Sequence, residues 1–358
     1  MPSDIRLVLE PLPGAEIVHY ASPEGMLTTH GRTVRYRCSA GQGRLNLPWA
    51  NPRDLAIGLR LLRRLLRLDK CNVLPVIEAG EWKALIAIRA GQCCHVQLDP
   101  LWLTRVLALR QCRNVLHQSV CQSGSGHHYF GEYGSNPGRQ SVPIYRSCTQ
   151  GRSWECIFEF PAGKARHVHG CFWDPYQRRV WVCTGDFAGE SHLVAADEDF
   201  KDLAWFGDGG QQWRTCHLMF TPTAIYWGTD SPLEQNHICR LDRRTGNLDF
   251  ILDLPGPVWY AKRLEDGWLV AATVVERGKA VKDRFAHVFA SRDGRTWQEA
   301  YRARKDAWKM PYFKNGVIAF ADGPQTSDCF YLSAEALVGL DGRSFRARLE
   351  KASEGEAP

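Results

Sequence analysis

A glycine-centred turn signature recurs at a fixed interval in this chain, and this interval constrains the fold more than any other feature. The signature combines a small hydroxyl residue, glycine and an aromatic ring, as in Ser147–Trp154 and Ser291–Trp297. The spacing between its glycines is one period (342 − 294 = 48 and 294 − 246 = 48) or close to three periods (294 − 151 = 143). Self-similarity at about 20–50 residues is typical of repeat architectures. The sequence therefore predicts a series of similar structural units.

Short strand-like segments separated by Gly, Pro, Asp or Asn fill the space between these turns. Three successive units have their expected strands at residues 166–172, 180–186, 191–196 and 204–206, then 213–220, 224–230, 237–242 and 248–254, then 258–264, 267–275, 286–291 and 297–302. Four strands in about 45 residues make the blade of a β-propeller. We predict an all-β chain in which residues 1–350 form a single propeller domain of seven four-stranded blades, with six blades as the alternative, and residues 351–358 form a frayed tail.

One segment interrupts the period near the N-terminus. The distance from Gly43 to Gly151 is 151 − 43 = 108, which is two periods plus 12 residues. Leucines and arginines at helical spacing predict an amphipathic helix over residues 55–69, within an insertion at 54–70 between the first two blades. The arginines of its polar face are Arg60, Arg63, Arg64 and Arg67. We expect the leucines to pack on the propeller and the arginines to be solvated; the alternative is peripheral contact of these arginines with an anionic membrane surface or a partner protein.

Charge and targeting signals restrict partners and location. The net charge of +6 over 358 residues is weak and scattered, so no nucleic-acid partner is expected, whereas an acidic glycan would suit it. The N-terminal segment has no apolar core of signal-peptide length, and no run of about 18 apolar residues occurs. The sequence predicts a cytoplasmic protein, with peripheral association at the inner membrane as the alternative.

The turn signature resembles the Asp-box, or BNR repeat, of sialidase-like β-propellers. Ser147–Trp154 has Thr149 in place of the aspartate, Ser291–Trp297 keeps the aspartate but is one residue shorter, and Asp341–Phe345 retains only the second half. The resemblance implies a propeller whose boxes lie on the face opposite the usual ligand face. It identifies the fold and leaves the chemistry open.

Three further strings are similar to uncharacterised bacterial BNR-repeat proteins that are labelled glycosyl hydrolases. They are Tyr129–Gly134, His167–Gly170 and Trp181–Asp186. Sialidases of similar fold carry an Arg-Ile-Pro string early in the chain, and this sequence has none. A true sialidase is therefore not expected.

Carboxylates recur where the expected second strand of each blade ends. They are Glu132, Asp186, Asp230, Glu276 and Asp322. In a propeller these ends meet the starts of the first strands around the central funnel, although capping of the following turn is the alternative role, for Asp322 above all. A glycosidase needs two carboxylates that flank the scissile bond. We predict Glu132 and Asp186 as this catalytic pair, with Asp230 in reserve.

Histidine, arginine and aromatic residues complete the expected site. His167 is the candidate base if the enzyme is a lyase, with Tyr133 and Arg214 beside it. The predicted substrate-binding residues are Tyr133, Arg139, His169, Glu190, Trp213, Arg214, Trp227, Tyr260 and Glu276. No cofactor and no metal are predicted; the alternative is a divalent metal, because His167 and His169 share one face of a strand and Glu132 or Asp186 could be a third ligand.

This combination of acids, bases and aromatic rings favours a carbohydrate-active enzyme at the central funnel, either a glycoside hydrolase or a polysaccharide lyase. The alternative is a non-catalytic propeller that binds sugar or acts as a scaffold in cell-surface polysaccharide biosynthesis. The sequence leaves open whether the chain is an enzyme.

Overall fold

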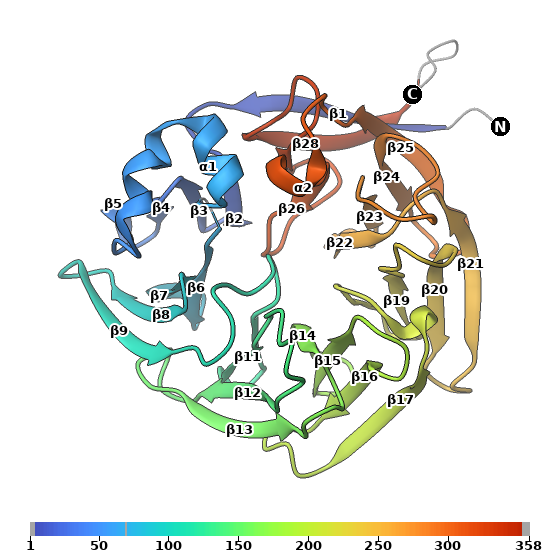
Figure 1. The fold of residues 1–358 in the computed structure, drawn as a ribbon, viewed down its shortest axis with the longest axis horizontal. Coiled ribbons are helices and arrows are strands. Elements are labelled where there is room, and N and C mark those ends of the chain that lie inside the picture. Colours follow the sequence, from blue (N-terminus) through green and yellow to red (C-terminus); the bar gives the residue numbers. More distant parts are fainter. Residues whose placement is uncertain (1–3, 69, 353–358) are drawn as a thin grey trace.

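Seven four-stranded antiparallel sheets form a ring in the computed structural model, which describes residues 4–68 and 70–352 (Figure 1). The seven-bladed β-propeller predicted from the 48-residue period is confirmed, and the six-bladed alternative is excluded. Residues 353–358, most of the tail expected to be frayed, lie outside the described residues. Lys351, assigned to that tail from the sequence, instead belongs to the last strand.

Six blades are built from four consecutive strands each. The first two are β2 (Ile17–Ser22), β3 (Gly25–His30), β4 (Thr33–Cys38) and β5 (Gly41–Asn46), then β6 (Asn72–Glu78), β7 (Glu81–Arg89), β8 (Gln92–Gln97) and β9 (Trp102–Ala108). The next two are β10 (Cys121–Gln122), β11 (His128–Gly131), β12 (Val142–Ser147) and β13 (Glu155–Phe160), then β14 (His167–Asp174), β15 (Arg179–Gly185), β16 (Ser191–Ala196) and β17 (Leu203–Gly209). The remaining two are β18 (Met219–Phe220), β19 (Ala224–Gly228), β20 (Asn236–Asp242) and β21 (Leu248–Leu254), then β22 (Val258–Arg263), β23 (Leu269–Thr273), β24 (Phe285–Ser291) and β25 (Gln298–Arg304).

The seventh blade closes the ring by using both ends of the chain. It consists of β26 (Val317–Phe320), β27 (Phe330–Glu335), β28 (Arg343–Lys351) and β1 (Ile5–Leu12). The N-terminal strand β1 pairs antiparallel with β28, in a register that runs from Ile5 opposite Lys351 to Leu12 opposite Ser344. Closure of this kind gives β28 an outer partner and ties the first and last parts of the chain together.

The turns between the third and fourth strands explain the period. In the turn after β24, Gly294 has a φ of +71° and donates its N–H to Ser291 Oγ at 2.9 Å. Asp293 Oδ1 accepts the N–H groups of Arg295 and Thr296 at 2.8 and 2.7 Å. These bonds satisfy the turn amides locally, while glycine takes the left-handed conformation that other residues avoid.

The third copy of the signature, Asp341–Phe345, lies at a different place in its blade. It joins the second strand β27 to the third strand β28, whereas the other copies precede a fourth strand. The short helix α2 (Met310–Phe313) lengthens the connection before β26. Counting 48 residues on from Gly294 therefore leads to the turn between the second and third strands of the last blade, not to the turn between its third and fourth strands. The equal spacing of Gly342 is therefore a coincidence of chain length.

The two period-defining glycines allow a matched stability test. Gly294 and Gly246 have nearly equal φ angles of +71° and +73°, but a Cβ on Gly294 would collide with the Tyr226 hydroxyl, whereas a Cβ on Gly246 would meet nothing within 4 Å. We expect Gly246→Ala to lower the free energy of unfolding by about 1 kcal/mol through backbone strain alone. Gly294→Ala should cost about 1–3 kcal/mol more because of overpacking. Urea denaturation of both variants checks this, and equal losses would contradict it.

The inserted helix lies between the first and second blades as expected, but its faces are inverted. It is formed by a 3-10 turn η1 (Pro52–Gly58) and the helix α1 (Arg60–Leu66). The expected packing of leucines inward and arginines outward is wrong. Exposed fractions are 78% for Leu55, 62% for Leu59 and 44% for Leu61, whereas Arg63 and Arg64 are buried at 5% and 3%.

Long-range ion pairs account for this inversion. Arg63 pairs with Glu16 at 3.2 Å, and Arg64 pairs with Asp306 at 2.8 Å. Arg60 binds Asp341 at 2.6 Å and Glu16 at 2.5 Å. Three of the four arginines proposed for membrane or partner contact are thus engaged by carboxylates of the propeller. Among the four, Arg67 is the one classed as exposed.

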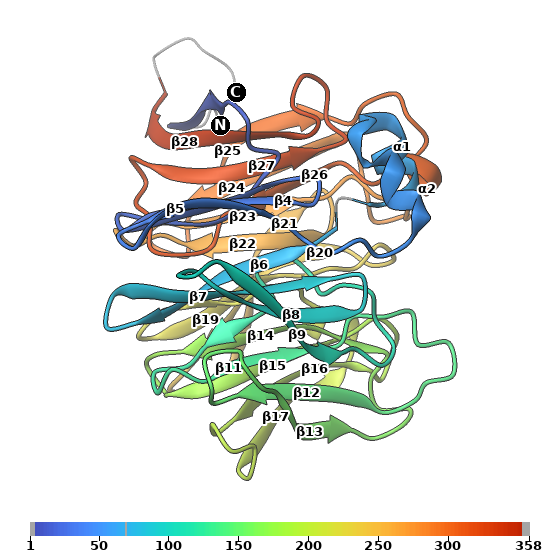
Figure 2. The ribbon, with the colours of Figure 1, turned by 90° about the vertical axis from the view of Figure 1, so that its left-hand side faces the viewer.

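Figure 2 shows α1 and α2 together on one face of the ring. Among residues 4–68 and 70–352, no helix has the length and apolar character needed to cross a membrane.

Candidate functional site

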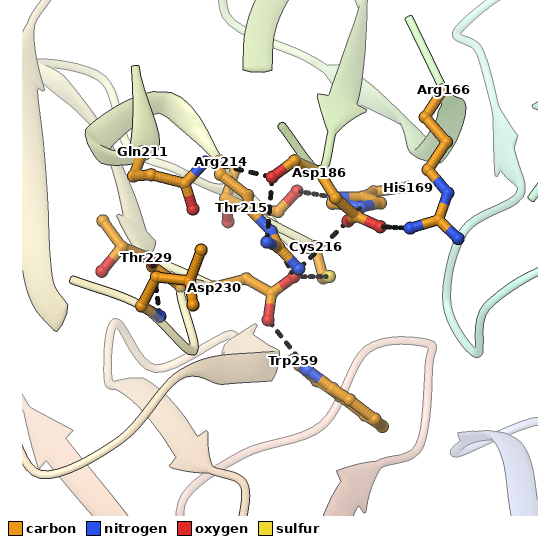
Figure 3. Close-up of polar contacts among 12 residues, drawn as sticks. Arg166, His169, Asp186, Gln211, Arg214, Thr215, Cys216, Thr229, Asp230 and Trp259 are labelled. Carbon is orange, nitrogen blue, oxygen red and sulfur yellow. Dashed lines mark hydrogen bonds and ion pairs between the residues drawn. The ribbon is translucent and has the colours of Figure 1, made fainter. Parts of the chain in front are cut away.

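Two of the predicted carboxylates, Asp186 and Asp230, bind one arginine, and a third, Glu276, interacts with the same arginine electrostatically. Asp186, Asp230 and Glu276 directly follow or lie within three residues of the second strands β15, β19 and β23. Arg214, which follows the 3-10 turn η2 (Gln211–Trp213), lies between the first two of them (Figure 3). The sequence alignment of blades therefore located these side chains correctly relative to the strands.

Arg214 connects the two aspartates. Its Nη2 lies 3.0 Å from Asp186 Oδ1, and its Nε lies 3.2 Å from Asp230 Oδ2. It also donates from Nη1 to the Asp186 backbone carbonyl at 3.0 Å. Trp259 donates its indole N–H to the other oxygen of Asp230 at 2.9 Å (Figure 3). Both aspartates are thereby fixed in orientation.

Asp186 also contacts two histidines and a second arginine. Its Oδ2 pairs with Arg166 at 2.7 Å, and its Oδ1 lies 3.1 Å from His169 Nε2 and 3.3 Å from His167 Nε2. Burial by itself would raise the pKa of the Asp186 carboxyl, but its interactions with His167 and His169 hold this pKa below the ordinary value. Burial lowers the pKa of the His167 imidazole, which favours the neutral ring.

Glu276 is the carboxyl group whose protonation differs most from that of a free glutamate. Burial raises its pKa to about 8, and repulsion by Asp230 and Asp186 adds to this, although Arg214 opposes it. One of its carboxyl oxygens is buried without a hydrogen-bond partner among the described residues. The raised pKa favours the protonated form of Glu276 near neutral pH.

Glu132, predicted as one of the catalytic pair, lies in a different environment. Its carboxylate accepts the backbone N–H groups of Arg110 and Gln111 at 2.6 and 2.7 Å and the Tyr145 hydroxyl at 2.9 Å. Glu132 therefore has a structural role, although it binds amides of the preceding connection rather than capping the following turn as the alternative from the sequence proposed. Asp322 follows the innermost strand β26 rather than a second strand, so it does not belong to the same series.

A cavity adjoins the acid cluster. Its volume is about 280 Å³, and Tyr133, Trp259 and Tyr260 are among its lining residues. The Tyr133 ring lies 4.3 Å from the His167 ring, between centroids, and Trp259 is the indole that binds Asp230. Tyr133 and Trp259 therefore connect the cavity to the acid cluster, whose own carboxylates are not among the lining residues.

Four other predicted binding residues form two contacting pairs, one partly exposed and one that packs in the core. Arg139 and Glu190 form an ion pair at 3.2 Å, and the Arg139 guanidinium lies 4.5 Å above the ring of Phe187, the residue after Asp186. Trp227 is fully buried, and its ring stacks on Trp213 with centroids 5.6 Å apart. Trp227 is thus a core residue between blades.

Four residues of this site were not among the predicted site residues. They are Arg166, Gln211, Cys216 and Trp259. Two of them could have been found from the sequence because they are close to predicted site residues: Arg166 directly precedes His167, and Cys216 follows Arg214 by two positions. Gln211 donates to the Asp186 carbonyl at 3.0 Å, a backbone contact that no side-chain pattern announces.

Comparisons with known proteins support the fold alone. No protein-family model and no curated protein matches the chain. The chain is similar to the extracellular domain of the putative one component system BT4673 from B. thetaiotaomicron, with a TM-score of 0.56 and 10% identity over 96% of this chain. It spans 39% of the length of that protein chain.

Two other solved structures match over nearly the whole length of both chains. A chain of the Mitotic Checkpoint Complex has a TM-score of 0.55 and 11% identity, covering 98% of this chain and 95% of that one. YCF48 bound to D1 peptide has a TM-score of 0.52 and 11% identity, covering 99% and 98%. Such low identity shows a shared propeller fold and carries no activity across.

Proposed function

We propose that the central funnel is the active site of a carbohydrate-active enzyme, with a glycoside hydrolase favoured over a lyase. The feature that supports this most is Glu276, whose pKa is raised to about 8 by burial and by the nearby Asp230 and Asp186, in a cluster that Tyr133 and Trp259 connect to the cavity. Hydrolysis of a glycosidic bond needs one carboxyl group that keeps its proton near neutral pH and a second that acts as carboxylate. Glu276 and Asp230 match these two roles better than the pair Glu132 and Asp186 inferred from the sequence.

In this proposal Glu276 donates its proton to the leaving glycosidic oxygen. Asp230, positioned by Trp259 and Arg214, is the carboxylate that activates water or attacks the anomeric carbon. Arg214 would stabilise the negative charge that remains on Glu276 after proton transfer, because it already interacts with this group electrostatically.

The lining of the cavity supports an acidic glycan as ligand. Besides the aromatic rings it contains the cationic side chains Arg67 and Lys70, together with Arg60 and Lys314, which pair with the lining acids Glu16 and Glu335. Sugar rings stack on aromatic faces, while arginine and lysine bind carboxylate or sulfate substituents. The resemblance to BNR-repeat propellers and the cytoplasmic location rest on the sequence and remain proposals beside this one.

A non-catalytic sugar-binding propeller is the second candidate, and one observation favours it. Both oxygens of Asp186 and of Asp230 already have donors within the protein. Such saturated carboxylates are suited to holding a binding site in shape.

Turnover of acidic oligosaccharides separates the two candidates. We expect the wild type to release reducing ends, and Glu276→Gln to lower kcat at least about 100-fold without weakening ligand binding, since the amide cannot supply a proton. Glu155→Gln, on the outer strand β13, is the matched control and should retain wild-type turnover. Binding with no turnover by the wild type would overturn the enzyme proposal and favour the binding protein.

A further inference from the structure

Three electron-pair donors converge at one point beside the cavity. His167 Nε2 and His169 Nε2 lie 3.1 Å apart. Asp186 Oδ1 lies 3.1 Å from His169 Nε2 and 3.3 Å from His167 Nε2. The three atoms thus form a nearly equilateral triangle, contributed by the inner strand β14 and by the residue that follows β15.

Backbone carbonyls fix how the two imidazoles are oriented. His167 Nδ1 lies 2.7 Å from the Gly134 carbonyl oxygen, and His169 Nδ1 lies 2.8 Å from that of Thr215. Because a carbonyl oxygen only accepts, Nδ1 is the donor in each ring. In the neutral imidazole the other ring nitrogen, Nε2, then carries no proton and presents its lone pair. Two lone pairs and a carboxylate oxygen then face one another, an arrangement that a shared cation stabilises.

The size of the triangle fits a transition metal. With metal–ligand distances of about 2.1 Å, ligand atoms lie about 3.0 Å apart at right angles and about 3.4 Å apart at tetrahedral angles. The observed separations of 3.1, 3.1 and 3.3 Å fall between these values. From this geometry we propose that His167, His169 and Asp186 bind a divalent transition metal, with Zn²⁺ as the ion that suits imidazole and carboxylate donors.

The surroundings supply what such a site usually has. Ligating histidines commonly donate the second ring N–H to a carbonyl, as both do here, and ligating carboxylates are themselves hydrogen-bonded. Arg166 binds Oδ2 of Asp186, and Arg214 binds Oδ1, the oxygen that also faces the two histidines. Cys216 and Asp230 form with His169 a second group of potential ligand atoms, all within 4.8 Å of one another.

Charge balance allows the cation despite the two arginines. Asp186 and Asp230 offset the charges of Arg166 and Arg214, so the cluster has no net positive charge that would repel a metal ion. The bound ion would face Tyr133 at the cavity wall, where a Lewis acid can polarise a substrate oxygen. This metal site does not depend on the glycoside hydrolase proposal, because a sugar-binding propeller could use it equally.

Equilibrium dialysis with Zn²⁺, followed by metal analysis, tests the site directly. We expect one tightly bound ion per wild-type chain, and at least about 100-fold weaker binding by His169→Gln and by Asp186→Asn. His287→Gln is the matched control: its Nδ1 faces Glu299 and its Nε2 faces Asp283, so its neighbouring carboxylates diverge. Zn²⁺ affinity that is equal in wild type, His169→Gln and Asp186→Asn would overturn the proposal.

A spectroscopic measurement on the wild type guards against variants that fail to fold, which circular dichroism will reveal. Co²⁺ added to the chelator-treated protein is expected to give visible d–d absorption bands that Zn²⁺ abolishes at one equivalent. Absence of these bands in the folded wild type would overturn the metal site whatever the variants do. Because neither measurement uses a glycan, failure of the metal site and failure of the hydrolase proposal are distinguishable.

Discussion

Replacing Arg243 by alanine is expected to lower the free energy of unfolding by about 3–5 kcal/mol, because it leaves a buried aspartate without its cation. Asp174, at the end of β14, is completely buried, and Arg243 binds its two oxygens at 2.6 and 3.0 Å. Arg243 also donates from Nε to the Thr221 carbonyl at 2.8 Å. One guanidinium thus joins two neighbouring blades. Its removal leaves the buried Asp174 carboxylate without a cation and Oδ2 without this donor, while Oδ1 keeps the N–H of Tyr176 at 3.0 Å.

An exposed ion pair provides the control for this loss. Arg348, with 41% of its side chain exposed, pairs with Glu10 and Glu350 between β28 and β1. Its replacement by alanine should cost less than about 1 kcal/mol, as solvent-exposed pairs usually do. Guanidinium denaturation at neutral pH measures both variants. A loss for Arg243→Ala no larger than that for Arg348→Ala would show that Asp174 is solvated or protonated when its partner is removed.

The sequence predicted the blades well because their signals are local. The strands that begin at His167 and Val258 are followed by turn residues, and the third strands β12, β20 and β24 lead into glycine turns. The strand predicted at 213–220 is wrong over most of its length, because Trp213 lies in η2 and the strand is only Met219–Phe220. Such signals depend on neighbours a few residues apart and therefore survive without knowledge of the tertiary structure. The copy at Gly342 was assigned to the wrong turn for the same reason. Spacing between turns cannot show that an inserted segment such as α2 has made up the length of a missing strand.

The orientation of the inserted helix could not be predicted from the sequence, because it depends on residues far away in the chain. Helical periodicity identified the leucine and arginine faces correctly, but which face is buried depends on Glu16, Asp306 and Asp341. The last two are more than 240 residues away from Arg64 in the chain (306 − 64 = 242). Burial of the arginines became favourable only when the fold brought these carboxylates together, and hydrophobic patterning contains no information about that.

The site itself was predicted in part. Asp186, Asp230 and Glu276 come together because each lies within three residues of the end of the second strand in its blade, and Arg214 meets them from the connection before β18. Glu132 has the same position in its blade, yet the loop amides of Arg110 and Gln111 occupy its carboxylate. Local sequence around Glu132 cannot reveal this, since these amides come from the preceding connection, about 20 residues earlier in the chain.

Replacing Glu276 by glutamine is expected to remove a large pH dependence of stability. The folded-state pKa of Glu276 is raised from 4.5 to about 8 by burial and by the neighbouring aspartates. Stability contributed by its protonated form is therefore fully present below about pH 4.5 and is lost as the pH rises through about 8. Over this window we expect the wild type to lose about 2–4 kcal/mol relative to Glu276→Gln, since each unit of pKa shift corresponds to about 1.4 kcal/mol.

Urea denaturation of wild type, Glu276→Gln and the exposed control Glu155→Gln at pH 5 and pH 8.5 measures this difference. Chelator is included in all samples so that a bound cation, which would stabilise the carboxylate form of Glu276, does not reduce the effect. The free energy of unfolding of Glu276→Gln, relative to that of wild type, should be larger at pH 8.5 than at pH 5. The free energy of unfolding of Glu155→Gln should change with pH as that of the wild type does. Parallel behaviour of all three proteins would mean that Glu276 is ionised across the range. The funnel would then hold three carboxylates without an acid, which would exclude proton donation by Glu276 to a leaving group and leave ligand or metal binding as the role of the cluster.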